Sequence, residues 1–431
     1  MKNKLFNALL LLLMACVPAS YYSGTDINSK HLRLQDWTYE PEIRTVLLRP
    51  DQNVEVNLQP SVTALDNYNM VLAFDDLRNQ NQFYNAKLIH CNYDWTKSTL
   101  LDLDFLDAFN EFPINNFDYS IDTAIPYVHY TFQVPRVKLP GNYVLLVYRG
   151  SNQQDIILTK RFSVFQNEVN FIPESSLVGP GAFAQINQQI NFTIRYRNYE
   201  LVNPMDNVWV VIRQNQRWDN VVSGLKPNFV REGVRELEYR FFDKSLFTAG
   251  NEFRFFDIRS LRFPGQNIYT IDRQHDPVIA KLGTDINRST QRYAQYLDLN
   301  GNFVVENADF GDGARRSDYL FVRFNLPSKP IDGKVYVMGA YNAWNKTIEN
   351  EMYYDNSNQA YTADLLLKQG WYDYTYHVES QSLPAHFFEG SFFETENWYE
   401  IMVYYRPFKP NADLLIGYFT LGLNPSAPRR N

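Results

Sequence analysis

The residues that could carry acid–base, nucleophilic or metal chemistry are few and widely scattered. The six histidines show no His-x-x-x-His spacing of the kind that places two imidazoles on one metal ion; they are His31, His90, His129, His275, His377 and His386. No Gly-x-Ser-x-Gly elbow or phosphate-binding loop is present. The sequence therefore predicts no catalytic centre, no bound cofactor and no metal site, and it favours a protein that is not an enzyme.

Acidic residues are grouped at three places that invite a functional reading. The groups are Asp75–Asp76, Glu394 with Glu396, and Asp102 with Asp104 and Asp107. Two carboxylates can flank a glycosidic bond, but acids on turns and strand edges are usually only solvated. The third group has the spacing of calcium ligands without the glycine and terminal glutamate of a calcium loop. We expect solvated acidic connections at all three.

The two cysteines, Cys16 and Cys91, do not form a disulfide framework, because Cys16 lies in an N-terminal targeting segment. Cys91 follows His90 directly within a strand-like run from Lys87 to Tyr93. Adjacent residues on a strand point to opposite faces, so the two side chains are not placed to form a catalytic pair. We expect Cys91 to be a buried structural residue.

Two tryptophans, Trp344 and Trp371, are candidates for stacking on sugar rings. The string Val-Tyr-Val-Met-Gly-Ala-Tyr-Asn-Ala-Trp at 335–344 resembles the opening of early-set immunoglobulin modules, among them starch- and glycogen-binding ones. The resemblance implies that exposed Trp344 and Trp371 would bind a glycan. The competing interpretation is that both rings are packed in a core or a turn, as most aromatic side chains are.

A repeated cassette indicates the elements that position these residues. Val128 to Val134 alternates large apolar and polar residues, and a corner at Leu139–Asn142 leads into the run Tyr143–Tyr148. Related cassettes surround Gly250, which lies 109 residues after Gly141, and Gly370, which lies a further 120 residues after Gly250. Strand, glycine corner, aromatic residue and strand are typical of an immunoglobulin-like sandwich, in which a corner tyrosine bonds back to the backbone. The sequence thus predicts an all-β chain of tandem immunoglobulin-like and early-set β-sandwich modules.

The predicted modules span residues 30–166, 167–314 and 315–425. A segment rich in proline, glycine and serine near 167–184 marks the first boundary, and residues 315–318 mark the second. Within the second module, Asn300–Gly301 predicts a hairpin turn between Tyr296–Leu299 and Phe303–Val305. The turn-rich aromatic segment from Pro113 to Tyr127 has no clear period and is expected to be an ordered loop. The irregular stretch from Asp104 to Pro126 is where we first expect contacts with a binding partner.

The first 19 residues read as a targeting segment. Two lysines precede an apolar stretch, Leu5–Ala15, that is too short to cross a bilayer as a helix. Val17-Pro18-Ala19 would end an ordinary secretory signal, whereas Leu13-Met14-Ala15-Cys16 resembles a lipoprotein box in which Cys16 is acylated. Both readings export the chain, and they differ only in whether a lipid anchors it.

The composition excludes some partners. The formal net charge is −7 over 431 residues, which disfavours nucleic acid, because phosphate binding needs clustered lysine and arginine. After the targeting segment, no apolar stretch reaches the length of a membrane helix. Aromatic residues make up 16% of the chain, as expected for many strands.

Several stretches of the sequence, in the order in which they occur along the chain, resemble the plug proteins of the type IX secretion system. They include Asn92–Trp95, Phe117–Thr123, Pro140–Tyr143, Glu389–Pro407 and Asp413–Tyr418. The resemblance implies a periplasmic protein of Bacteroidota, associated with the outer membrane. It implies that the partner is the giant outer-membrane β-barrel translocon, whose periplasmic opening such proteins keep closed at rest. The alternative function is that of a carbohydrate-binding β-sandwich protein of the cell envelope.

Overall fold

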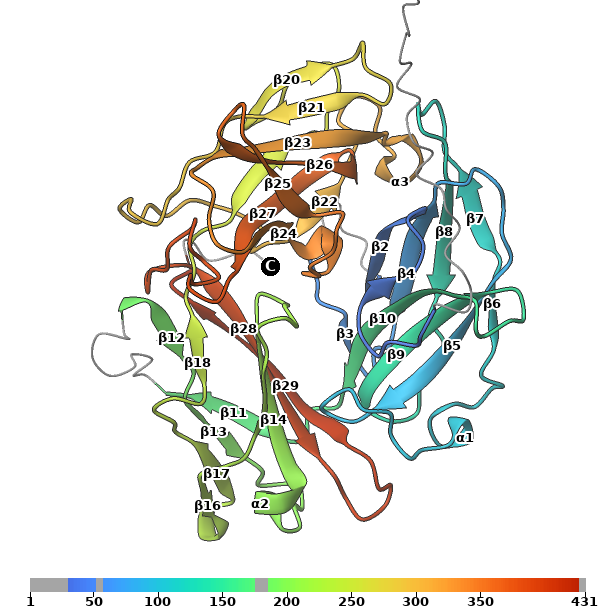
Figure 1. Cartoon of the computed structure of the whole chain (residues 1–431). Coiled ribbons are helices and arrows are strands. Elements are labelled where there is room, and N and C mark those ends of the chain that lie inside the picture. The colour runs from blue at the N-terminus through green and yellow to red at the C-terminus, as the bar shows by residue number, and fades with distance from the viewer. Residues whose placement is uncertain (1–29, 52–56, 175–184, 426–431) are drawn as a thin grey trace, which may run out of the picture.

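The computed structural model describes residues 30–51, 57–174 and 185–425, and these residues form three β-sandwiches (Figure 1). Strands make up 44% of the structure and helices 5%, which confirms the predicted all-β fold. The targeting segment, with Cys16, lies outside the described residues. Within the described part of the chain, no helix is long and apolar enough to cross a membrane.

The first sandwich packs two antiparallel-rich sheets face to face, ordered β1-β10-β9-β5-β6 and β2-β4-β8-β7, with β3 alongside β10. Its elements are β1 (Trp37–Thr38), β2 (Ile43–Pro50), β3 (Val62–Ala64), β4 (Met70–Asp76), β5 (Tyr84–Cys91), α1 (Asp102–Phe105), β6 (Phe112–Ile114), β7 (Asn116–Tyr119), β8 (Val128–Gln133), β9 (Gly141–Arg149) and β10 (Ile156–Phe165). The predicted alternation holds in β8, where Val128, Tyr130 and Phe132 all enter the core.

The second sandwich combines a central segment of the chain with its C-terminal hairpin. Its sheets are ordered β11-β13-β17-β16 and β15-β14-β28-β29, with the pair β12-β18 beside them. The elements are β11 (Asn170–Pro173), β12 (Asn187–Gln189), β13 (Phe192–Arg195), α2 (Pro204–Asn207), β14 (Val208–Gln214), β15 (Val222–Leu225), β16 (Phe229–Arg231), η3 (Glu232–Val234), β17 (Glu236–Tyr239), β18 (Leu246–Thr248), β28 (Asn397–Tyr405) and β29 (Leu414–Leu423).

The third sandwich is one continuous path of strands that encloses its own core, ordered β19-β27-β24-β25-β26-β23-β21-β20, with β22 beside β27. Its elements are β19 (Arg254–Asp257), β20 (Ile268–Asp272), β21 (Ile279–Leu282), β22 (Phe303–Val305), α3 (Gly313–Arg316), β23 (Tyr319–Pro327), β24 (Lys334–Met338), η4 (Ala340–Asn342), β25 (Glu351–Asp355), β26 (Ala360–Lys368) and β27 (Gly370–Glu379).

The third sandwich is inserted into the second, so the predicted division into 167–314 and 315–425 is wrong. Strand β14 pairs with β28 along its whole length, from Val208–Tyr405 to Gln214–Tyr399. One core therefore joins residues that lie almost 200 positions apart. Sequence periodicity marks strands but carries no information about which distant strand completes a sheet, and this is why the boundary was misplaced.

Two of the three predicted corners are tyrosine corners. The hydroxyl of Tyr143 donates to the carbonyl of Leu139 at 2.7 Å, and the hydroxyl of Tyr372 donates to the carbonyl of Lys368 at 2.6 Å. Each tyrosine follows its corner glycine by two positions and closes a loop of the same length. Gly250 is different, because it lies on the connection from β18 to β19, where the chain leaves the second sandwich for the third.

The expected hairpin at Asn300–Gly301 is also corrected. Both residues have positive φ, 52° and 81°, as a tight turn requires. However, β22 after the turn pairs with β27, and Tyr296–Leu299 before it form no strand. A Cβ on Gly301 would lie 2.6 Å from the ring of Trp344, so this close approach is what requires glycine there.

We expect loss of either corner hydroxyl to destabilise the protein. Tyr143→Phe and Tyr372→Phe each leave a carbonyl unpaired, and each should lower the free energy of unfolding by about 1–3 kcal/mol. Chemical denaturation followed by fluorescence measures this. Tyr269→Phe is the matched control, because Tyr269 is exposed and its substitution should change stability by less than about 0.5 kcal/mol.

Candidate functional site

The sheet that contains the C-terminal hairpin is covered on both faces. On one face, Ile401 and Val403 of β28 enter the core of the second sandwich. On the other face, Met402 and Tyr404 pack against the first sandwich, in a cluster that includes Val62 of β3. The hairpin therefore fixes the first sandwich against the second, and it has no solvent-facing side along this length.

A buried ion pair lies within this first junction. Arg213 of β14 donates two hydrogen bonds to Glu400 of β28, at 2.7 and 2.6 Å, and both side chains are nearly inaccessible to solvent. The hydroxyl of Tyr418 also donates to Glu400, at 2.8 Å. The guanidinium groups of Arg213 and Arg161 lie 4.4 and 4.8 Å from the ring of Trp218, and Arg161 belongs to the first sandwich.

The junction between the first and third sandwiches is built around Asp75 of β4. Its carboxylate accepts hydrogen bonds from Lys368 and Tyr319 of the third sandwich, both at 2.7 Å. His129 of β8 lies 2.6 Å from the other oxygen. Asp75 and Lys368 are fully buried, so neither charge is exposed to water. Burial alone would raise the pKa of Asp75, but Lys368 and His129 outweigh it and hold the pKa below its usual value of 3.8.

Trp344 lies where all three sandwiches meet. Its side chain is only 6% exposed and packs against Phe253, with the guanidinium of Arg217 of the second sandwich 4.0 Å from its ring. Neighbouring Asn345 donates to the carbonyl of Asp36 of the first sandwich at 3.0 Å. A sugar ring has no access to Trp344, so the structure contradicts its predicted role in glycan stacking.

Trp371 is half-buried on β27 and is also packed against protein. Its ring stacks on that of Phe255 at 4.8 Å, with only 10° between the planes. The guanidinium of Arg259 lies 5.5 Å from the same ring. Trp344 and Trp371 therefore do not form a shared exposed platform.

The other residues that were considered for chemistry, Cys91, His90 and Asp76, are buried in the fold. Burial raises the pKa of Cys91 to about 12 and lowers that of His90 to about 4, so at neutral pH the thiol is protonated and the imidazole uncharged. Asp76 is paired with Arg78 at 2.8 Å. Among the residues that the structure describes, no group of three or more histidine, cysteine or acidic side chains is placed to hold a metal ion.

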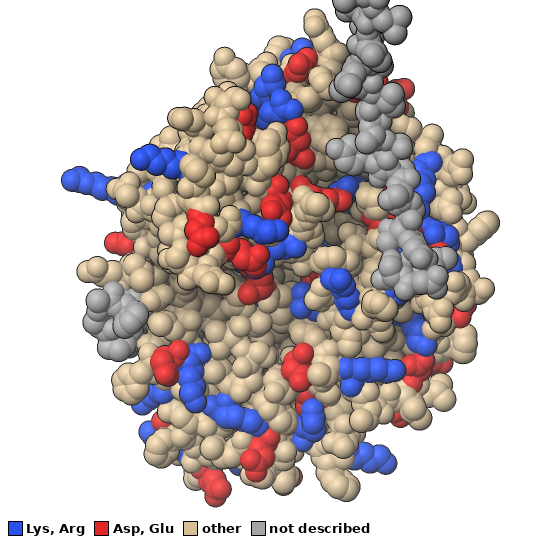
Figure 2. Space-filling model, viewed as in Figure 1, with Lys and Arg blue, Asp and Glu red and all other residues tan. Residues whose placement is uncertain are grey.

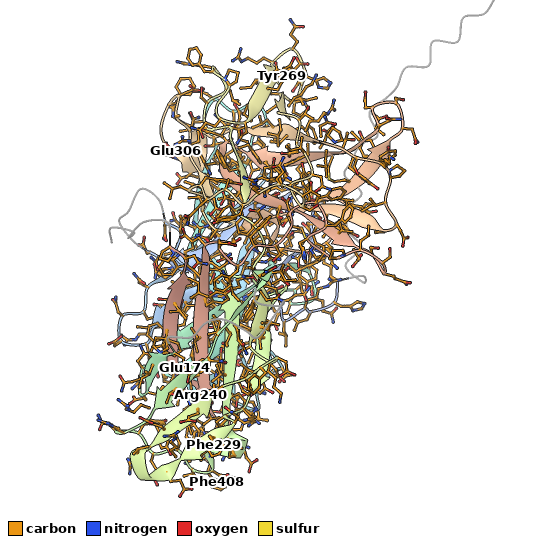
Figure 3. The ribbon with its side chains drawn as sticks, turned by 90° about the vertical axis from the view of Figure 1, so that its left-hand side faces the viewer. Glu174, Phe229, Arg240, Tyr269, Glu306 and Phe408 are labelled. Atoms are coloured by element: carbon orange, nitrogen blue, oxygen red, sulfur yellow. The ribbon has the colours of Figure 1, made fainter. Side chains whose placement is uncertain are left out.

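One end of the molecule carries exposed apolar side chains from three separate loops (Figures 1 and 3). We call this the loop-end surface; its residues are Leu101 and Leu103 at α1, Val202 and Met205 at α2, and Phe408 at the tip of the β28–β29 hairpin, and they are 45–101% exposed. Hydrogen bonds join the loops, from the Thr99 hydroxyl to the carbonyl of Asn411 at 3.3 Å and from Arg406 N–H to the carbonyl of Asn207 at 2.9 Å.

The segment from Asp104 to Pro126, expected to be a binding loop, is divided between two roles. Its first part adjoins the loop-end surface and carries the exposed Phe109. Its last part is held against the third sandwich, where Ile121 N–H donates to the carbonyl of Arg315 at 2.8 Å and Ala124 N–H to Asp318 at 2.6 Å. The first part is free to contact a partner.

Comparison with protein families assigns the first sandwich. Residues 43–166 match the family described as the type 9 secretion system plug protein 1st domain. The chain belongs to the type IX secretion system plug protein family. It is therefore a component of type IX secretion in the cell envelope.

A solved structure shares most of the architecture of this plug family member. The crystal structure of a hypothetical protein from Parabacteroides merdae is 28% identical, with a TM-score of 0.85, over 91% of this chain and 100% of that chain. No curated protein matches the chain. The likeness extends well beyond residues 43–166, so the three-sandwich arrangement is shared by both proteins.

We expect the buried charges at Asp75 to be strongly coupled. Asp75→Asn leaves Lys368 buried without its counter-ion and should cost about 3–5 kcal/mol of unfolding free energy. The double variant Asp75→Asn/Lys368→Met should lose less than the two single variants together, by at least about 0.5 kcal/mol. Urea denaturation of all three measures the coupling.

The exposed pair Arg323–Asp364 supplies a matched control for this cycle. Asp364→Asn should cost less than about 1 kcal/mol, because water already solvates both charges. An additive Asp75–Lys368 cycle would show that the two charges do not stabilise one another across the junction.

The lowered pKa of the Asp75 carboxyl predicts that the unfolding free energy depends on pH. Because the pKa of Asp75 is lowered in the folded protein, its contribution is complete above its unfolded pKa and is lost as the pH falls below about 4. Asp75→Asn should therefore flatten the acid side of the stability profile. Unfolding free energies measured from pH 6 down to pH 2.5 test this; an unchanged acid slope in the variant would assign the loss to other groups.

Proposed function

We propose that the protein is a non-enzymatic periplasmic plug that binds the periplasmic opening of the type IX translocon barrel and seals it at rest. The observation that carries the proposal is the match of residues 43–166 to the plug family, on a body in which each sandwich is joined to the other two. Sealing the barrel requires a protein that is wide enough to obstruct the opening, that keeps its shape under load, and that can dissociate again.

The size of the chain suits this role. A globular chain of this length has a diameter of about 55–60 Å. The largest outer-membrane barrels have 36 strands, and closing that many tilted strands gives a barrel of about 70 Å across at the backbone. Side chains that line the lumen narrow it further, so one copy of the protein suffices to obstruct such an opening.

The junctions support a rigid stopper. Linkers alone would let three sandwiches move independently, as small polar interfaces between domains usually do. Here the ion pair Lys368–Asp75 is buried across the junction between the first and third sandwiches, so separating these two would expose charges that have lost their partners. Separating the first sandwich from the second would expose the apolar cluster around Met402 and Tyr404. The arrangement therefore resists being forced through the pore one sandwich at a time.

We propose the loop-end surface as the contact with the translocon. Its apolar residues alternate with acidic ones, since Leu101 and Leu103 flank Asp102 and precede Asp104. A mixed polar and apolar surface fits an interface between partners that are each stable alone and that must separate when substrate is exported.

The location follows from the targeting segment. Export to the periplasm brings the chain to the inner side of the outer membrane, and acylation of Cys16 would anchor it there. Cleavage after Ala19 would leave it unanchored. The alternative, a carbohydrate-binding protein of the envelope, required exposed Trp344 and Trp371, and neither offers a free stacking face.

An affinity pull-down tests the plug directly. The tagged full chain should co-purify a very large β-barrel from gently solubilised outer membranes, and that barrel should pass current in a planar bilayer only after the protein is removed. Recovery of no barrel, with retention on a polysaccharide column instead, would replace the plug by the glycan-binding alternative.

Variants at the two ends of the molecule test the contact surface. Leu103→Lys combined with Phe408→Ser should reduce barrel recovery at least tenfold while leaving the melting temperature unchanged, because both side chains are exposed. The matched control is the double variant Phe263→Lys/Tyr269→Ser, whose two residues are also exposed. Figure 3 shows Tyr269 at the end of the molecule opposite Phe408. Equal recovery with both double variants would remove the loop-end surface from the interface.

A further inference from the structure

A cavity of about 930 Å³ lies at the centre of the molecule, between the three sandwiches. The view in Figure 2 shows a hollow at the middle of this face. The first sandwich contributes β3 and Phe165, the second contributes Asn215, Trp398 and Tyr418, and the third contributes the turn at Asn300. The volume falls within the range of about 300–1,000 Å³ that is usual for ligand sites.

The side chain of Asn300 is the first indication of a ligand. It is only 5% exposed and lines the cavity, yet among the residues that the structure describes neither its amide nitrogen nor its amide oxygen has a hydrogen-bond partner. A buried amide without partners costs about 1–3 kcal/mol for each unsatisfied group. The neighbouring amide of Asn215 is satisfied, because it donates to Asn397 and accepts from Trp398 N–H. The deficit is therefore specific to Asn300.

Strand β3 presents an unpaired backbone edge at the same cavity. All three of its residues line the cavity, and in the described part of the chain β3 pairs with β10 alone. The bonds from Leu65 N–H to Phe165 and from Ser163 N–H to Ser61 show that alternate residues face β10. Ala64 therefore directs its N–H and carbonyl away from β10, where a further strand could pair with them.

The rest of the described wall is mainly apolar or uncharged. Phe165 and Tyr418 stack at 5.1 Å and form an aromatic side. Only two acidic residues line the described wall, Asp51 and Glu400, and Glu400 is neutralised by Arg213. A charged ligand would find no free counter-ion in the depth of the cavity, so the site suits a neutral ligand.

We propose that the central cavity binds an extended, uncharged peptide segment of a partner protein. The segment adds to the free edge of β3 by main-chain hydrogen bonds, and one of its peptide groups supplies the donor and the acceptor that Asn300 lacks. The unpaired edge favours a peptide over a neutral oligosaccharide, because a sugar has no regular array of N–H and C=O groups to match it. This site is separate from the loop-end surface, and the inference goes beyond the proposed function.

The test uses the full chain and an array of fluorescein-labelled decapeptides built from Ser, Thr, Asn, Val and Tyr. A subset should bind the wild-type protein and slow hydrogen exchange at Val62–Ala64. Ala64→Pro should weaken binding of that subset at least tenfold, because proline removes the outward N–H without removing a bond to β10. Asn300→Gly should do the same, since glycine keeps the positive φ while deleting the amide.

Tyr119→Pro is the matched control for the proline substitution. Ser120 N–H donates to the carbonyl of Tyr127, so Ser120 faces β8 and Tyr119 directs its N–H outward from the edge strand β7, away from the cavity. This variant should bind the peptides as the wild type does.

Three results would overturn the proposal. One is that no peptide of the array binds. Another is that binding is equal in Ala64→Pro, Asn300→Gly and the wild type. The third is that a neutral oligosaccharide, and no peptide, protects Val62–Ala64 from exchange. Exchange on the wild-type protein needs no variant to fold, so the proposal stays testable if a substitution is not tolerated. None of these results affects the barrel pull-down, so the two proposals can fail separately.

Discussion

The structure depends on a single constraint, the return of the C-terminal hairpin to the second sandwich. Strands β28 and β29 complete a sheet begun at β14, after the whole third sandwich has intervened. One face of the hairpin fills the core of the second sandwich, and the other face fills the junction with the first. Removing the hairpin would therefore open a core and an interface together, which couples the first and second sandwiches into one cooperative unit.

The charged groups inside the junctions follow from this closure. Buried ion pairs contribute little net stability, because desolvation offsets most of their attraction, but breaking one is costly. The pair Lys368–Asp75 therefore acts mainly to fix one orientation between the first and third sandwiches, whereas Arg213–Glu400 fixes the register of β14 against β28. Apolar contacts alone would permit the two sandwiches to slide, whereas a buried, hydrogen-bonded ion pair permits a single register. For a protein that closes an opening by its shape, a fixed orientation matters more than additional stability.

The two proposed binding surfaces lie where the packing of the sandwiches leaves side chains or backbone groups without contacts. The loop-end surface consists of exposed apolar side chains, and the central cavity contains an amide and a strand edge that no element of the described residues pairs. Trp344 shows the opposite case. It stands in a string typical of sugar-binding modules, but Arg217 and Phe253 enclose it, so its ring serves the junction. A residue type suggests a chemistry, and the surroundings decide whether that chemistry is available.

The sequence by itself determined the local features of this protein. Alternating residues predicted β8, and the glycine corners predicted the tyrosine bonds of Tyr143 and Tyr372, because these patterns depend on neighbours within a few positions. Family resemblance supplied the plug assignment. Only the tertiary structure decided that β14 pairs with β28, that Asp75 meets Lys368, and that Asn300 faces β3 across a cavity. These contacts join residues about 190 to 290 positions apart, and no local period encodes such a pairing, since it is selected by the burial of whole faces.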